Sequence, residues 1–547
     1  MSAVLPNPFY YLENFQCVLD WIAQRYDDLL IDEERRFLAR FPALPQASRA
    51  LLTRMVMRKG SLFRASKLHY DEIGCPDQAA QALLSEGWLE VHPPLGIEEL
   101  FQLLRKPELD RVFDLSPSTQ SRKTELLESL RDAHAEMKPL AAWHGEMQEA
   151  VYAVKIGPLC ERFRLMFFGN LYQTWSEFVL SNLGIYRYED VAFDASSRGF
   201  LRRSDVDDYL HLHRCRERFD QGEYLDDIVP DIPAAPLPNS WLEGRRQKLL
   251  FRIAQQYERC GEAERALAIY RCCHYPGARL RTIRVLERGG KIDEATTLAN
   301  IAAAAPENEA ESQAVQRTLP RLQRKLGLTK AESKKRSTPE SMSLCLSFSD
   351  DCPSVERAVC IHFAQDDAPV FYVENTLFNS LFGLLCWPAI FAALPGAFFH
   401  PFHHGPADLS SPDFHTRRTH LFEACLSQLE SGAYRQTVVD TFRAKHGIQS
   451  PFVFWEALDE TLLMLALDCI PPGHLRACFE RMLIDIPSNR SGFPDLIQFW
   501  PGARRYRMIE VKGPGDRLQD NQLRWLQHFA AHEMPVAVCY VQWENAA

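Results

Sequence analysis

The sequence predicts a multidomain protein that is mainly α-helical and ends in an α/β domain. Its length of 547 residues exceeds what one hydrophobic core holds, so about two to four domains are expected. Apolar residues recur at helical spacing through residues 1–325. From residue 344 onward, short apolar runs typical of strands alternate with helical segments, which indicates a sheet covered by helices.

Composition and charge narrow the possible classes of protein. Apolar residues make up 46% of the chain and charged residues 24%, the usual balance of a globular protein with buried cores. The formal net charge of −10 excludes a uniformly polybasic binder, so affinity for a polyanion must come from local basic patches. The 15 cysteines are scattered without matched CxxC pairs, which indicates free thiols in a reducing cytoplasm and not a zinc finger.

Two segments bear on secretion and membranes. The opening MSAVLPNPFYYLENFQ lacks the basic and apolar regions of a signal peptide. The most apolar run, LFNSLFGLLCWPAIFAAL, contains Asn379, Ser380 and Pro388 and predicts a buried helix ending near the proline. We therefore expect a cytoplasmic protein with no secretion signal and no membrane partner.

The first two regions are helical. In residues 1–110, amphipathic helices alternate with short turns and end on a strand-like tip, which predicts a winged-helix-like DNA-binding region; a plain helical bundle fits the same pattern. A basic face is expected from Arg54, Arg58, Lys59, Arg64 and Lys67. Residues 111–235 are predicted to form a second helical DNA-binding region, which ends near the proline-rich VPDIPAAPLPNSW.

The next region, residues 236–325, carries two related helix-turn-helix segments. Their turns, CGEAERAL and GGKIDEAT, are separated by nearly the tetratricopeptide period. Two such units are fewer than a free solenoid needs, so we expect them to dock on a neighbour. Residues 326–343 are polar and basic and predict an exposed linker into the last domain, residues 344–547.

The chemistry is concentrated in FPDLIQFWPGARRYRMIEVKGPGDRLQDNQLRWLQHF. Glu510 and Lys512 lie two residues apart on a predicted strand and therefore project to the same face, with Val511 on the other. Asp495 begins the preceding strand, so a hairpin would place it beside Glu510. The sharp turn that follows leads into a helix that could carry Gln522 back towards the acids.

This pattern predicts a site for a hard divalent cation. Mg²⁺ takes one or two carboxylates, here Asp495 and Glu510, together with waters and substrate phosphate; the Val511 carbonyl could add an oxygen. Such a cation lowers the pKa of bound water, and Lys512 could stabilise the transition state of phosphodiester hydrolysis. Taken alone, Glu-Val-Lys is also typical of a solvated strand face.

The arrangement resembles the PD-(D/E)xK (restriction-endonuclease-like) core, and more closely its VRR-NUC branch. That branch continues into G-P-G-D-x-L-x-x-x-Q-x-x-W-L, which this sequence matches at Gly513, Pro514, Gly515, Asp516, Leu518, Gln522, Trp525 and Leu526. The resemblance implies a catalytic acid on an earlier helix, and Glu374 in YVENTLFNSLF is the candidate. A structural alternative is a first-turn Glu favoured by the helix dipole.

Most of the chain is similar to the Fanconi-associated nuclease family. The similarity extends to FFGNLYQTWSEFVLSNLGIYRYE and FHPFHHGPADLSSPDF, besides the repeats and the N-terminal region. It implies a structure-selective DNA nuclease that uses Mg²⁺ or Mn²⁺, cuts near 5′ flaps, degrades from a 5′ end and acts in interstrand crosslink repair. Eukaryotic members carry an N-terminal zinc finger and a SAP module. Since neither is evident here, we expect a compact bacterial form, associated with the nucleoid and without a ubiquitin-binding module.

The expected partner is branched or flapped double-stranded DNA with a 5′ phosphate. Phosphate contacts require Lys and Arg, and near the nuclease motif these are Arg504, Arg505 and Arg517. The family resemblance implies a separate basic pocket for the 5′ phosphate, which we place between the clusters containing Arg216 and Lys248. The alternative for these clusters is ordinary solvated helix faces.

Other functions remain open at this point. One is a catalytically silent helical-repeat DNA-binding adaptor. The presence of all four candidate catalytic residues, Glu374, Asp495, Glu510 and Lys512, argues against such a loss of activity. Another is a nuclease of the same core that acts on a different nucleic acid. The histidines of FHPFHHG lack a fourth zinc ligand and predict loop packing.

Overall fold

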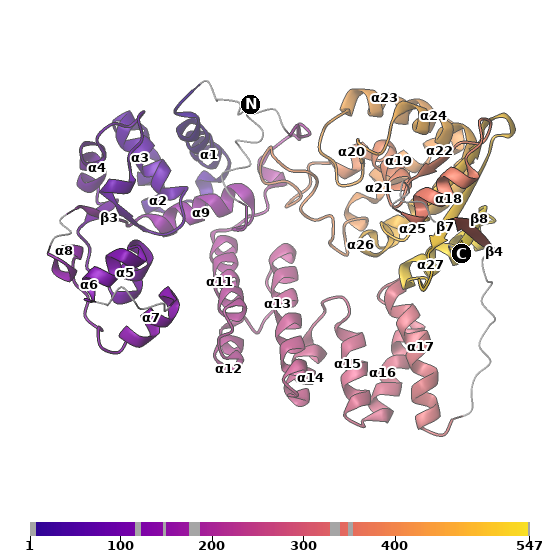
Figure 1. Ribbon diagram of the computed structural model, residues 1–547, viewed down its shortest axis with the longest axis horizontal. Helices are drawn as coiled ribbons and strands as arrows, with labels where there is room; N and C mark the ends of the chain where they lie inside the picture. Colours follow the sequence, from indigo (N-terminus) through magenta and orange to yellow (C-terminus); the bar gives the residue numbers. More distant parts are fainter. Residues whose placement is uncertain are drawn as a thin grey trace. The chain divides into compact units, whose positions relative to one another are not determined.

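The computed structural model describes residues 7–114, 122–145, 149–173, 186–328, 340–347 and 354–544 (Figure 1). Most of the predicted linker and residues 174–185 of the FFGNLYQTWSEFVLSNLGIYRYE motif lie outside these ranges. The chain divides into an N-terminal unit, Met1–Tyr186 with Phe200–Val206, and a C-terminal unit, Arg187–Gly199 with Asp207–Ala547.

The N-terminal unit combines helices with a small antiparallel sheet of order β1-β3-β2. Its strands are β1 (Leu62–Arg64), β2 (Leu89–Val91) and β3 (Val151–Val154). Its helices are α1 (Tyr10–Tyr26), α2 (Asp32–Arg40), α3 (Gln46–Val56), α4 (Pro76–Ser85), α5 (Ile97–Leu103), α6 (Lys106–Val112), α7 (Lys123–Leu130), α8 (Leu140–Trp143) and α9 (Gly157–Phe168). Strand β2 lies where the sequence predicts the strand-like tip.

Part of the predicted basic face of this unit is neutralised. Arg54 pairs with Glu72 at 2.7 Å and stacks over the ring of Tyr11. Arg64 is buried and pairs with both Glu108 and Glu149. Arg64, buried between two carboxylates, is therefore poorly placed to bind phosphate.

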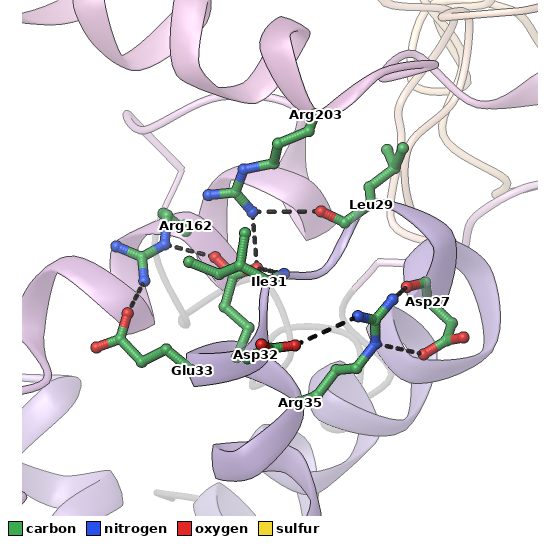
Figure 2. A network of polar contacts seen from close by, with 9 residues as sticks. Asp27, Leu29, Ile31, Asp32, Glu33, Arg35, Arg162 and Arg203 are labelled. Carbon is green, nitrogen blue, oxygen red and sulfur yellow. Dashed lines mark hydrogen bonds and ion pairs between the residues drawn. The ribbon is translucent and has the colours of Figure 1, made fainter.

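A buried carboxylate ties three helices of the N-terminal unit together. Glu34 in α2 is 0% exposed and accepts hydrogen bonds from Arg162 of α9 and from Arg203 at the start of α11 (Arg203–Asp220). It also caps its own helix by accepting from the Ile31 amide at 3.0 Å. The two arginines converge from different helices (Figure 2), and Arg162 reaches Glu33 as well. A buried charge is tolerated only when it is paired in this way.

The C-terminal unit begins with paired helices. These are the remainder of α11, α12 (Leu225–Ile228), α13 (Ser240–Arg259), α14 (Ala263–Cys272), α15 (Ala278–Arg288), α16 (Ile292–Ala304) and α17 (Glu309–Lys325). Consecutive helices from α13 to α17 share one apolar core. The predicted turns are present, and each contains a glycine in the left-handed region, Gly261 at φ 83° and Gly290 at φ 76°.

A five-stranded mixed sheet of order β4-β8-β7-β6-β5 forms the centre of the predicted α/β domain. The strands are β4 (Glu340–Ser347), β5 (Val370–Tyr372), β6 (Leu496–Trp500), β7 (Arg505–Lys512) and β8 (Val536–Glu544). Strand β8 pairs in parallel with β4 and β7, whereas β5, β6 and β7 pair antiparallel. Helix α18 (Val355–Phe363), which contains the sequence ERAVCIHF, precedes β5. Helix α27 (Asp520–Ala531) follows β7.

The two sides of β7 serve different purposes. Ile509 and Val511 pack with Val359 of α18 in a small apolar cluster. Met508 belongs to the larger core that includes Trp525 of α27. Because side chains alternate along a strand, Glu510 and Lys512 lie on the side of α27.

A helical insertion separates β5 from β6. It comprises α19 (Leu377–Leu385), α20 (Trp387–Ile390), α21 (Thr419–Leu426), α22 (Gln428–Ser431), α23 (Tyr434–Lys445), α24 (Glu460–Cys469), α25 (Pro472–Ile484) and α26 (Ile486–Asn489). Helix α19 is buried throughout, as predicted. Among the described residues no single helix is long and apolar enough to cross a membrane, although the pair α24 and α25, bent by 106°, meets that test together.

The histidine-containing loop of the insertion is a packed structure. The rings of His400 and His403 are in contact, with centroids 4.1 Å apart and planes tilted by 35°, and each accepts a hydrogen bond from a nearby backbone amide. Burial lowers the pKa of His403 to about 4, so its ring stays neutral near pH 7. These histidines are thus packed within the loop, as the sequence predicts.

Candidate active site

The hairpin of β6 and β7 brings the two predicted carboxylates together. Leu496 pairs with Ile509 in the antiparallel register, which places Asp495 opposite Glu510. Asp495 Oδ2 accepts a hydrogen bond from the Val511 amide at 2.8 Å. This contact fixes the side chain of an acid that is only 7% exposed.

Glu510 and Lys512 form the second part of the site. Lys512 Nζ lies 2.7 Å from Glu510 Oε1, which confirms that both side chains project from the same face of β7. Gln522 Nε2 of α27 donates to the same oxygen at 2.6 Å, as the sequence predicts. Glu510 is 0% exposed, and within the described part of the chain its other oxygen, Oε2, has no hydrogen-bond partner.

Glu374 lies in the turn between β5 and α19, before the helix begins, so its predicted place on a helix was wrong. The reason is local: Asn375 adopts φ 52°, in the left-handed region, and the helix starts only after this residue. Asn375 Oδ1 accepts from the amides of Gly492 and Phe493, which ties this turn to the loop before Asp495. Glu374 is exposed and accepts a hydrogen bond from the Tyr372 hydroxyl.

The electrostatics show that the positive charge of Lys512 compensates these acids only in part. Burial raises the pKa of Asp495 to about 6, and the negative charges of Glu374 and Glu356 contribute to the rise. Burial and the charge of Asp495 raise the pKa of Glu510 to about 7. Burial opposes the charge of Lys512, but the hydrogen bond and charge of Glu510 outweigh it and hold the lysine pKa above its usual value. A single ammonium thus faces several carboxylates.

These features fit a hard divalent cation. The oxygen Oε2 of Glu510 is buried and receives no hydrogen bond from the residues that the structure describes, and the neighbouring carboxylate of Asp495 repels it. Mg²⁺ is held by one or two carboxylates while water and phosphate supply its other ligands. In the described ranges no group of three His, Cys, Asp or Glu side chains is close enough to hold a metal ion by itself. The site therefore matches a cation whose coordination is completed by water and substrate.

Sequence reasoning missed two side chains beside this centre. Glu356, in the first turn of α18, adds negative charge near Asp495. Its helix start was readable, since Ser354 accepts from the Arg357 amide as an N-cap. Tyr372, on β5, holds the Glu374 carboxylate, and no signal in the sequence distinguishes it from other strand tyrosines.

The predicted DNA-binding arginines of the hairpin occupy different ends of β7. Arg504 and Arg505 lie at its start, and about 3.3 Å per residue separates them from Glu510 by roughly 16 to 20 Å along the strand. Arg517 is exposed just beyond the turn that follows Lys512. Arg517 is therefore brought to the carboxylate end, whereas Arg504 and Arg505 are not.

Arg216 and Lys248 lie on helices joined by an ion-pair chain. Arg216 on α11 pairs with Asp220, which also binds Arg252 of α13 at 2.7 Å. Lys248 is exposed one helical turn before Arg252. Asp220 thus links the helix of Arg216 to the helix of Lys248, although Lys248 itself forms no ion pair with the other described residues.

Comparisons with known proteins agree with this architecture. Family models match at residues 9–90 (FAN1, HTH domain), 94–143 (Fanconi anemia-associated nuclease SAP domain) and 429–543 (VRR-NUC domain). The second match shows that the expected lack of a SAP module was wrong: residues 94–143 match the SAP family model although they carry no signature that sequence reading found.

Proteins similar to nearly the whole of this chain occur in bacteria and plants. A Fanconi-associated nuclease 1 homolog of Pseudomonas aeruginosa is 57% identical over 543 residues, covering 99% of this chain and 97% of that protein. A homolog of Oryza sativa is 24% identical, covering 98% of this chain and 63% of that protein.

Solved structures are similar over the whole chain. One, described as "Crystal structure of paFAN1 bound to 2nt 5'flap DNA with gap", has a TM-score of 0.93 at 57% identity and covers 100% of both chains. A second, bound to 1nt 5'flap DNA with gap, has a TM-score of 0.90 at 57% identity and covers 98% of this chain and 100% of that chain.

Proposed function

The chain belongs to the Fanconi-associated nuclease family, and from this premise we propose that it cuts flapped DNA at the centre formed by Asp495, Glu510 and Lys512. The observation that carries the proposal is the meeting of two buried carboxylates beside an ammonium, with one carboxylate oxygen left without a donor. That donor set suits a metal-dependent phosphodiesterase.

Each side chain has a distinct proposed role. Asp495 and Glu510 would hold Mg²⁺ or Mn²⁺, with Glu374 and the Val511 carbonyl as further oxygen donors. When bound, such a cation supplies charge neutralisation and an acidic water for attack on the phosphodiester. Lys512 places a positive charge where the transition state becomes more negative. Gln522 would orient Glu510 by holding Oε1, which leaves Oε2 available to a cation.

The proposed substrate is branched or flapped double-stranded DNA with a 5′ phosphate. The support is the flap DNA bound by two similar crystal structures. Arg517 would contact the backbone near the cut, and Arg216 with Lys248 would hold the 5′ phosphate at a distance from it. We further propose 5′-to-3′ exonuclease action and a place in interstrand crosslink repair at the bacterial nucleoid.

Replacing Asp495 tests the catalytic assignment. Asp495→Ala should abolish Mn²⁺-dependent cleavage of a labelled 5′-flap duplex, while DNA affinity, measured by fluorescence anisotropy in EDTA, stays near wild type. Asp495→Asn keeps an oxygen for the Val511 amide but loses the charge, so a folded but inactive Asp495→Asn separates chemistry from folding. Asp468→Ala, which removes an exposed acid paired with Arg435, is the matched control. Mn²⁺-dependent cleavage by Asp495→Ala would contradict the assignment.

A further inference from the structure

One face of the last repeat helix, α17, contacts the nuclease domain. Glu309, Gln313 and Arg317 are spaced four residues apart and therefore lie on one side of the helix. Glu309 pairs with Arg481 of α25. Gln313 Oε1 accepts from Arg524 of α27 at 2.7 Å.

The last two residues of this stripe bind the first turn of α27. Arg317 binds the Asp520 carboxylate with both terminal nitrogens, one of them 2.8 Å from Oδ2. Gln313, only 7% exposed, donates to the Asp520 carbonyl at 3.4 Å. The contact therefore fixes both the side chain and the backbone at the point where α27 begins.

The two residues after Asp520 reach the proposed catalytic acids. Asn521 donates to Ser491 at 3.3 Å and packs against Gly492, where an added Cβ would lie 2.9 Å from the Asn521 backbone. Gly492, at φ 97°, is therefore required by both conformation and space. Gln522 donates to Glu510 at 2.6 Å.

The loop that Asn521 contacts continues through Gly492 and Phe493 into Asp495. Three consecutive residues of this turn thus make three different contacts. Asp520 binds the repeat helix α17, Asn521 binds the loop before Asp495, and Gln522 binds Glu510. A rotation or shift of this single turn would move both acids relative to each other.

We propose that Gln313 and Arg317 are positioning residues for DNA cleavage, which act through the first turn of α27 on Glu510 and Asp495. The inference rests on the proposed function, since it requires these two acids to be catalytic. The Arg317–Asp520 pair is about half exposed, so its direct contribution to stability is small. Its main effect is on the position of the proposed metal-binding carboxylates. Residues that hold such carboxylates in place influence metal affinity and reaction rate.

This contact gives the repeat helices a part in the reaction. The same helical region carries Arg216 and Lys248, the proposed ligands of the 5′ phosphate. A rigid contact between α17 and α27 would hold the cleavage centre in register with DNA bound by the repeats. Small displacements matter, since a misplacement of about 1 Å can cost roughly a hundredfold in rate.

The test is single-turnover cleavage of a labelled 5′-flap duplex by the full chain, as Mn²⁺ is titrated. In the double variant Gln313→Ala/Arg317→Ala, we expect the rate at saturating DNA and metal to fall about tenfold and the Mn²⁺ midpoint to rise about tenfold. DNA affinity, measured with Ca²⁺ in place of Mn²⁺, should stay within about twofold of wild type. The single variant Arg317→Lys, which retains the positive charge, should show most of the wild-type cleavage rate.

The matched control is Arg321→Ala. Arg321 lies one turn further along α17 and pairs with Glu287 inside the repeats. It should retain the wild-type rate and metal midpoint. Equal losses in Arg321→Ala would mean that destabilising α17 is enough, and would overturn the proposal.

Two further outcomes also decide the matter. A loss of DNA affinity that matches the loss of rate would make Arg317 a DNA contact and overturn the positioning role. A wild-type cleavage rate in the double variant would also overturn the positioning role. Glu510→Ala distinguishes failure of the positioning role from failure of the proposed function. If Glu510→Ala is inactive while the double variant cleaves normally, only the positioning role is refuted. If Glu510→Ala still cleaves DNA, the catalytic centre itself is refuted.

Discussion

The two buried acids of the site keep their protons to a higher pH than ordinary carboxyl groups do. Asp495 and Glu510 have pKa values raised to about 6 and about 7, mainly because burial removes water from their charged forms. The ordinary values are about 3.9 and 4.3. The folded protein therefore binds protons here that the unfolded chain has already lost, and a divalent cation competes with those protons for the same oxygens.

The effect of pH on the metal-free protein follows from the sign of these shifts. Between about pH 4 and 7 the folded state holds more protons than the unfolded state, so rising pH reduces stability, by about 1.4 kcal/mol per unit for each affected group. The loss is complete above the raised pKa values. Mn²⁺ should therefore raise the melting temperature more at pH 7.5 than at pH 5.5, as measured by differential scanning fluorimetry. Glu510→Gln should lack most of this pH-dependent increment, and equal Mn²⁺ increments at both pH values would contradict the linkage.

At this scale the sequence predicts the residues that share one strand or one turn. The period of two along β7 places Glu510 with Lys512, and the G-P-G turn explains how Gln522 returns to them. Glu356 could not be predicted, because its charge acts on Asp495 only after α18 packs against the sheet. Glu374 was assigned to a helix because no pattern announces the left-handed backbone at Asn375.

At the scale of elements, the N-terminal unit depends on one buried carboxylate. Glu34 joins α2 to Arg162 and Arg203, and neither arginine would keep a full set of partners without it. Breaking a buried ion pair by removing one member costs more than the pair contributes, because the other charges stay desolvated.

Glu34→Ala should therefore destabilise the N-terminal unit by about 3 kcal/mol, the low end for a buried pair since both arginines are partly exposed. Hydrogen exchange of the full chain should show amide protection in α2 and α9 falling about a hundredfold. Glu33→Ala removes an exposed partner of Arg162 and should cost less than about 1 kcal/mol. Similar protection in both variants would show that Glu34 is not the main link.

Element type was predictable where periodicity is strong. The turns at Gly261 and Gly290, the buried α19 and the hairpin of β6 and β7 all follow from local pattern. The neighbour relation of β5 and β6 does not, because α19 to α26 lie between them in the sequence. Pairing across such an insertion is decided by tertiary packing, which no local signal records.

At the scale of the whole molecule, an acidic chain must bind DNA through local basic strips. The net charge is −10, yet Arg216 of α11 and Arg252 of α13 both pair with Asp220, and Lys248 lies one helical turn before Arg252. Binding through such strips is strongly weakened by salt, because each phosphate contact releases counterions.

Arg216→Ala/Lys248→Ala tests the proposed 5′-phosphate site. Cleavage of substrates with a short phosphorylated 5′ flap should fall about tenfold or more, since roughly 1.4 kcal/mol of lost phosphate binding corresponds to tenfold. Substrates whose 5′ end lacks the phosphate should be much less affected. Arg435→Ala/Arg443→Ala removes the same charge from α23 and should leave the preference intact. An equal loss of cleavage on every DNA substrate, or no loss on any of them, would contradict the proposed 5′-phosphate site.

The position of β8 in the sheet has a consequence during protein synthesis. This last described strand lies between β4 and β7, so β7 has one of its two neighbours only once residues 536–544 have been made. A chain released early from the ribosome cannot complete the strand layer that supports Glu510 and Lys512. We therefore expect a fragment that ends before residue 536 to lack the proposed cleavage activity, because β7 has lost one of its two neighbours.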